Sequence, residues 1–157
     1  MEAFRVSVKR PIEFLTSVLE AFSSEEDAKV SFEGDLQMLR NASLAGASTD
    51  ETTCLRRQTL EPILDFLVIP LSRHNLRVLV SLCGRVGVRT RVIHVQIESG
   101  GVLVFGAYDQ FDPAGAWIST RFGEANLLRL QGQRVIDSYE LVRDSEQNSS
   151  SARAPVE

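Results

Sequence analysis

One stretch of the chain carries a histidine and several carboxylates at close spacing. His94, Gln96 and Glu98 alternate with apolar residues, as they would on one face of a β-strand. Two acids, Asp109 and Asp112, follow a little further along the chain. A histidine held beside a carboxylate can transfer protons as a general acid or base. His94 with Asp109 or Asp112 is therefore a candidate catalytic pair of a small enzyme.

The same residues also fit a structural interpretation. One face of an antiparallel sheet commonly lies in water, and a strand there alternates polar with apolar residues. On that view the three polar residues of the strand are exposed to solvent. Asp109 and Asp112 stand shortly before Pro113, where short acidic side chains commonly cap a turn. We favour this interpretation and keep the catalytic pair as the alternative.

The sequence indicates neither a metal site nor a cofactor site. The two histidines, His74 and His94, lie on different predicted elements, whereas zinc ligands are usually paired at short spacing. The glycines of the GRVGVR segment (84–89) lack the lysine and hydroxyl residue of a phosphate-binding loop. A net charge of −4 argues against a nucleic-acid binder, which needs a basic surface.

Acidic residues gather around a short predicted strand at residues 29–34. An acidic surface attracts a basic partner and speeds its association. The predicted binding surface combines these acids with polar residues of the later strands: Glu25, Glu26, Asp27, Glu33, Asp35, His94, Gln96, Glu98, Tyr108 and Asp109. This pattern favours a non-enzymatic macromolecule-binding protein with a basic protein partner. Its most concrete form is a toxin-neutralising immunity protein or a small regulator.

The first part of the chain predicts a strand, a helix and a second strand. Apolar and polar residues alternate from Phe4 to Val8, which is typical of a half-buried strand. Apolar residues then recur at helical spacing from Pro11 to Phe22, and proline suits the first position of a helix. The KVSFEG segment (29–34) predicts the second strand.

The middle of the chain begins with a long polar segment. Residues from about 36 to 59 lack periodicity and predict a loop, and loops of this length are often functional. The apolar run from Ile63 to Ile69 predicts a buried strand. Ser72 suits the N-cap of a helix that ends near Gly84. Two strands around residues 99–101 (SGG) predict a tight hairpin.

A third helix near residues 122–132 and a last strand near residues 135–139 complete the predicted domain. The element order is β-α-β, long loop, β-α-β-β-α-β. This order predicts an α+β fold, a single domain over residues 1–142 with helices packed on a mixed or mostly antiparallel sheet. The polar, serine-rich end of the chain, residues 143–157, predicts a disordered tail.

Length and composition fit an intracellular globular protein. The chain has 157 residues, of which 43% are hydrophobic, as expected for one domain with its own core. No apolar run approaches the roughly 20 residues of a membrane span. The two cysteines, Cys54 and Cys83, lack the spacing of a redox or metal motif, which favours free thiols in a reducing cytoplasm.

Overall fold

The computed structural model describes residues 2–85 and 91–143. Within these ranges the chain forms one sheet in which every neighbouring pair of strands is antiparallel. The strand order is β3-β2-β4-β5-β6-β1-β7. The strands are β1 (Ala3–Val8), β2 (Lys29–Gly34), β3 (Asp65–Pro70), β4 (Val92–Ser99), β5 (Val102–Ala107), β6 (Ala116–Ser119) and β7 (Ile136–Val142).

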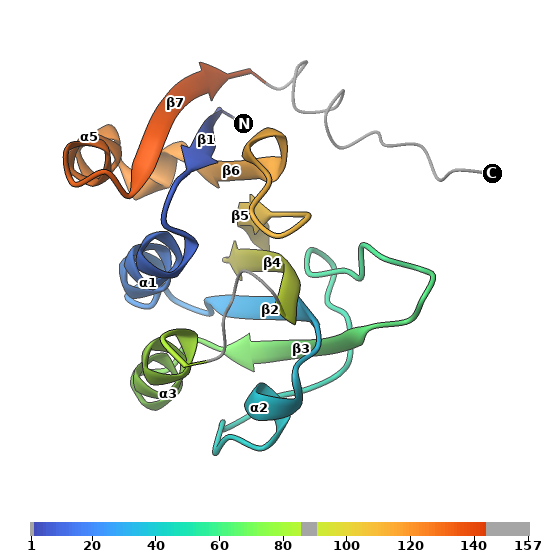
Figure 1. The fold of residues 1–157 in the computed structure, drawn as a ribbon. Coiled ribbons are helices and arrows are strands. Elements are labelled where there is room, and N and C mark those ends of the chain that lie inside the picture. Colours follow the sequence, from blue (N-terminus) through green and yellow to red (C-terminus); the bar gives the residue numbers. More distant parts are fainter. Residues whose placement is uncertain (1, 86–90, 144–157) are drawn as a thin grey trace.

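The longer helices all cover one face of this sheet, the helix face (Figure 1). They are α1 (Pro11–Phe22), α3 (Arg73–Cys83) and α5 (Glu124–Gly132). A short helix, α2 (Gln37–Arg40), follows β2, and two 3-10 turns, η1 (Pro113–Gly115) and η2 (Thr120–Phe122), flank β6. The main hydrophobic core lies between the helices and the sheet.

Helix α1 shows how residue spacing builds this core. Its buried residues recur every three or four positions and form one apolar stripe: Phe14, Leu15, Val18, Leu19 and Phe22. The ring of Phe14 packs against Phe105 of β5, with centroids 6.0 Å apart. The ring of Phe22 lies 6.3 Å from that of Phe122, which links α1 to η2. The aromatic contacts therefore fix the helix against both the sheet and its neighbouring turn.

The α+β fold with helices packed on an antiparallel sheet confirms the prediction. Helix α1 and strand β2 have the predicted bounds, and the Ser72 hydroxyl caps α3 by accepting the N–H of Asn75. The sheet holds one strand more than predicted, because β6 lies between β5 and β1. At four residues, β6 is too short to show a clear alternation. The predicted tail beyond Arg143 lies outside the described residues.

The prediction that a buried strand starts at Ile63 was wrong. Strand β3 begins at Asp65, whose partner on β2 is Gly34. Ile63 is 81% exposed, and Leu60 is 76% exposed. These residues precede the first paired position, so their apolar character does not reflect burial in the sheet.

The opposite side of the sheet, the second face, carries a very different set of residues. One residue from each strand lies on a row that crosses the whole sheet: Val68, Ser31, Gln96, Gly106, Trp117, Arg5 and Glu140. Polar residues predominate, and the row ends in the exposed ion pair of Arg5 with Glu140 at 3.1 Å. The connection between α2 and β3 runs along this side (Figure 1).

Strands β4 and β5 form the predicted hairpin. Gly100 and Gly101 have φ values of 60° and 75°, which only glycine adopts without steric cost in a tight turn. A Cβ atom placed on either glycine would meet nothing within 4 Å. A side chain here would therefore act through backbone conformation rather than through a clash.

Replacing Gly101 by valine should lower the free energy of unfolding by about 1–3 kcal/mol, because a β-branched residue is strained at positive φ. Urea denaturation followed by circular dichroism measures this change. Gly132→Ala at the end of α5 is the matched control, since a Cβ there also meets nothing within 4 Å. The control should not destabilise, because alanine favours a helix. An unchanged midpoint for Gly101→Val would contradict the strained turn.

Candidate functional site

The polar residues of β2 and β4 on the second face are buried, which corrects the expectation of a solvated strand face. Their exposed fractions are small: Ser31 2%, Glu33 1%, His94 7%, Gln96 3% and Glu98 7%. Residues 48–59, here called the covering segment, bond to this face and exclude solvent from it. The long polar loop predicted from the sequence thus forms a second layer on the sheet.

Side chains of the sheet hold the covering segment by accepting its backbone hydrogen bonds. The Glu33 carboxylate accepts the N–H of Gln58 at 2.8 Å and that of Thr59 at 3.1 Å. The side-chain oxygen of Gln96 accepts the N–H of Arg56 at 3.1 Å. Because a buried N–H needs an acceptor, these polar side chains replace the carbonyl groups of a neighbouring strand. Their burial therefore has a structural cause.

Further contacts fasten the first half of the covering segment. The Thr52 hydroxyl donates to Glu98 at 3.1 Å and accepts the N–H groups of Cys54 and Leu55. Leu55 is fully buried in a small apolar cluster with Phe66, Val68 and Leu103. At the margin of the sheet, Ser48 forms a two-bond antiparallel bridge with Val68, with N···O distances of 2.9 and 2.7 Å. This bridge covers part of the outer edge of β3.

His94 joins two separate segments through its two ring nitrogens. Nε2 lies 2.9 Å from the hydroxyl oxygen of Thr59 in the covering segment. Nδ1 accepts the backbone N–H of Asp109 at 3.2 Å. Burial lowers the pKa of His94 below its ordinary value, and the nearby charges of Glu33 and Asp109 oppose this shift. The predicted residues His94 and Asp109 therefore do meet, through the backbone of Asp109.

The segment that contacts Nδ1 has an unusual backbone. Asp109, Gln110 and Phe111 have φ values of 51°, 59° and 63°, and they are here called the left-handed turn. Successive non-glycine residues rarely adopt this conformation, which costs roughly 1–2 kcal/mol per residue. The N–H of Gln110 donates to the carbonyl of Ile93 at 2.9 Å, and Phe111 is buried in the main core. These contacts hold the turn in place.

Tyr108 directly precedes the left-handed turn and contacts the buried polar layer through Gln96. Its hydroxyl accepts a hydrogen bond from the side-chain amide of Gln96 at 3.0 Å, and burial raises the pKa of Tyr108. A Cβ on Gly106 would stand 2.7 Å from this hydroxyl and 2.8 Å from the indole nitrogen of Trp117. Glycine at position 106 thus lets both aromatic side chains lie close to the sheet.

Asp112 serves as a turn cap, in agreement with the structural interpretation of its sequence position. Its Oδ1 atom accepts the N–H of Ala114 at 2.8 Å and so starts η1. His94 uses its ring nitrogens on Thr59 and on the Asp109 backbone. The two ring nitrogens of His94 therefore link two segments of the chain.

The predicted acidic surface does not form one continuous patch, which is a second correction. Glu33 points into the buried layer. Residues 25–27 lie before the start of β2, and Asp35 lies after its end. The six residues of the strand, roughly 20 Å in length, therefore separate Asp35 from the acids of residues 25–27. A carboxylate oxygen of Glu25 lies 3.8 Å from a guanidinium nitrogen of Arg121. A carboxylate oxygen of Asp35 lies 3.9 Å from a guanidinium nitrogen of Arg91. Glu26 and Asp27 are exposed in the turn after α1.

Residues 60–63, here called the tip, form an exposed apolar feature that the sequence analysis missed. Leu60 and Ile63 are the most exposed of the large apolar side chains in the described ranges, at 76% and 81%. Thr59 before the tip bonds to Glu33, and Arg57 donates to the carbonyl of Leu64 at 2.6 Å. The sequence signal was Glu61 and Pro62 between the two apolar residues, although Ile63 itself continues into the apolar run that leads to β3.

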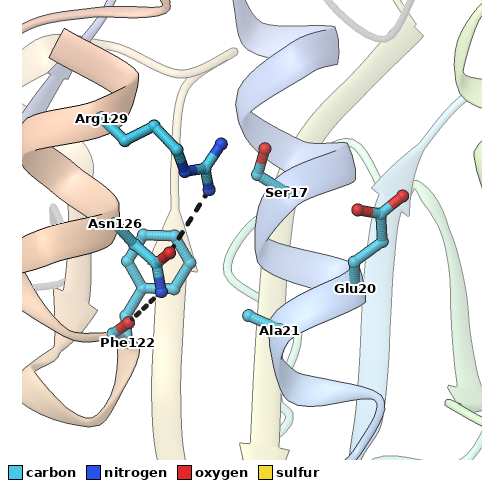
Figure 2. Close-up of a pocket in the computed structure, with 6 residues that line it drawn as sticks. All are labelled: Ser17, Glu20, Ala21, Phe122, Asn126 and Arg129. Atoms are coloured by element: carbon cyan, nitrogen blue, oxygen red, sulfur yellow. Dashed lines mark hydrogen bonds between the residues drawn. The ribbon is translucent and has the colours of Figure 1, made fainter. Parts of the chain in front are cut away.

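A hollow on the helix side of the molecule lies between α1 and the region of α5 (Figure 2). Its volume is ≈ 320 Å³, and it is lined by Ser17, Glu20, Ala21, Phe122, Asn126 and Arg129. Arg129 donates to Asn126 at 3.3 Å, and Asn126 donates to the carbonyl of Phe122 at 2.6 Å. These polar groups bond to each other, and the lining includes no predicted site residue.

Over the described ranges, no three or more His, Cys, Asp or Glu side chains are grouped so that they could hold a metal ion. In the same ranges no helix has the length and apolar character needed to cross a membrane. Cys54 and Cys83 are both free thiols. Comparisons with protein-family models, with curated proteins and with solved structures found no match to this chain.

Replacing Glu33 by glutamine should lower the free energy of unfolding by about 1–3 kcal/mol, because an amide group would then face a backbone N–H donor in a buried site. Asp35→Asn is the matched control: Asp35 is exposed, and surface substitutions usually change stability by less than about 0.5 kcal/mol. Chemical denaturation measures both. Equal effects of the two variants would show that Glu33 does not anchor the covering segment.

Proposed function

We propose that this protein binds a partner protein without catalysing a reaction, and that the tip is its main contact. The observation that carries the proposal is the exposure of Leu60 and Ile63, at 76% and 81%, on a segment fastened at both ends. Scattered apolar residues are common on protein surfaces. Two large ones within four positions of a fixed loop instead resemble the anchors that protein interfaces use.

The anchoring of the tip supports this role. Glu33 and His94 hold Thr59 on one side, at 3.1 and 2.9 Å. On the other side Arg57 bonds to Leu64 and lies over the ring of Phe66, 5.1 Å from its centroid. A binding loop that is already ordered loses less conformational entropy when it meets its partner. The covering segment thus presents the tip in one defined position.

The engagement of the polar residues also favours binding over catalysis. His94, Glu33 and Gln96 use their side-chain atoms to hold the backbone or hydroxyl groups of the chain itself. A general base must reach the proton that it removes from a substrate. The small enzyme with His94 and Asp109 or Asp112 remains the alternative, and it would require these contacts to be exchanged for contacts with substrate.

A narrower form of the proposal is a toxin-neutralising immunity protein or a small regulator that meets a basic partner. The net charge of −4 and the exposed acids Glu26 and Asp27 support that form. Complementary charge mainly speeds association and makes it sensitive to salt. Apolar anchors mainly slow dissociation, because their burial is lost only when the complex separates.

A partner retained by the wild-type chain should be lost by the double variant Leu60→Ser/Ile63→Ser. We expect at least a tenfold weaker affinity, since burying one such side chain is worth about 1.5–3 kcal/mol. Affinity capture at pH 7.5 and physiological salt, followed by binding kinetics with the captured protein, measures this. Leu128→Ser/Leu141→Ser is the matched control, because Leu128 and Leu141 are 55% and 51% exposed elsewhere on the surface.

A third variant, Glu26→Lys/Asp27→Lys, separates the acidic surface from the tip. If the acids only steer the partner, this variant should slow association at low salt and leave dissociation unchanged. Retention of the partner at wild-type affinity by the tip variant would refute the role of the tip. Loss of the partner by the tip variant and by the leucine control alike would indicate a nonspecific apolar effect instead.

A further inference from the structure

The contacts of His94 define its protonation state. A backbone N–H can only donate, so the nitrogen that accepts from Asp109, Nδ1, carries no proton in this arrangement. The proton of the neutral ring must then sit on Nε2, which donates to the Thr59 hydroxyl. The neutral Nε2–H tautomer is therefore the form that holds the covering segment and the left-handed turn together.

We propose that His94 is a pH-operated clamp, in which uptake of one proton from solvent at Nδ1 releases the left-handed turn. The added proton would place two N–H donors against each other across 3.2 Å, so the hydrogen bond from Asp109 is lost. The Nε2–H group can still donate to Thr59. The covering segment therefore keeps its contact with the ring while the turn loses its own.

The left-handed turn is the element that this loss affects most. Its three residues have φ between 51° and 63°, a conformation that L-residues leave readily once the contacts that impose it weaken. The N–H of Gln110 still donates to Ile93, the N–H of Asp112 still donates to Tyr108, and Phe111 stays packed in the main core, so the loosening centres on Asp109. Opening would extend to Tyr108, whose ring lies 5.7 Å from that of His94.

The groups that face His94 come from every element around it. Strand β2 supplies Glu33 and the turn supplies Asp109, and both carboxylates favour the charged ring. The two cations of the covering segment have other partners: Arg56 pairs with Glu51 at 3.2 Å, and Arg57 lies over the ring of Phe66. Burial outweighs the two acids and lowers the pKa of His94.

The direction of the pH effect follows from this shift. A histidine released into solvent takes up a proton near its ordinary pKa of about 6.5, and the clamped ring takes it up only at lower pH. The clamp is therefore fully closed above about pH 6.5 and weakens progressively as the pH falls below that value.

Amide hydrogen exchange of the isolated protein tests the clamp. Once corrected for intrinsic exchange, the protection of Asp109 and Gln110 should fall by up to about tenfold for each pH unit below 6.5. Amides of the core strand β2 should keep their protection. The emission of Trp117, the single tryptophan, should shift with the same midpoint, since its indole lies beside Tyr108 over Gly106. Constant protection of the turn down to pH 5 would overturn the proposal.

Two variants assign the effect to one residue. His94→Gln cannot take up a proton and should lose the pH dependence, whereas His74→Gln should keep it. An unchanged pH response in His94→Gln would refute the clamp. If that variant does not fold, nitrogen NMR of the wild-type ring decides, because Nδ1 must titrate with the midpoint seen for the Asp109 amide. No partner is present in these measurements, so their failure leaves the proposed binding role of the tip intact.

Discussion

The covering segment can lie on the sheet only because side chains of β2 and β4 accept its backbone hydrogen bonds. An N–H group buried without an acceptor costs about 1–3 kcal/mol, which few surface loops could bear at several positions. Glu33 accepts two such groups, and Gln96 accepts a third. A purely apolar second face would offer no acceptors, so the polar character of these strands is what permits a second layer there.

The position of the tip follows from the same hydrogen bonds. The chain is fixed at Thr59 by Glu33 and His94, and it enters the sheet again at Asp65. The residues between these points have no strand to pair with, so Leu60 and Ile63 project into solvent. His94 also connects the end of the covering segment to the left-handed turn, because its ring contacts both Thr59 and the N–H of Asp109. The buried polar side chains of β2 and β4 thus determine the positions of both the tip and the left-handed turn.

Local patterns predicted the elements of the fold but not the second layer. The helical spacing after Pro11, the Ser72 cap and the glycines of the hairpin each specify structure within a few residues, and all three were found. The alternation around His94 showed correctly that one side of β4 is polar. It could not show what covers that side, because the acceptor Gln96 and the donor Arg56 are 40 positions apart. The same limit applies to Glu33, which resembles a surface acid in sequence.

The two faces of the sheet are therefore held by forces of different kinds. The helix layer rests on apolar contacts that are non-directional and insensitive to charge. The covering layer has one apolar anchor at Leu55 and otherwise rests on directional hydrogen bonds to polar side chains. Some of these side chains are ionisable, so the layer favours one register and responds to a change of charge. Protonation of His94 would thus act first on the hydrogen bond to the left-handed turn, and it would reach the main core only through Phe111 of that turn. A protein built in this way can keep a stable scaffold while its binding surface changes, since local opening requires far less free energy than global unfolding.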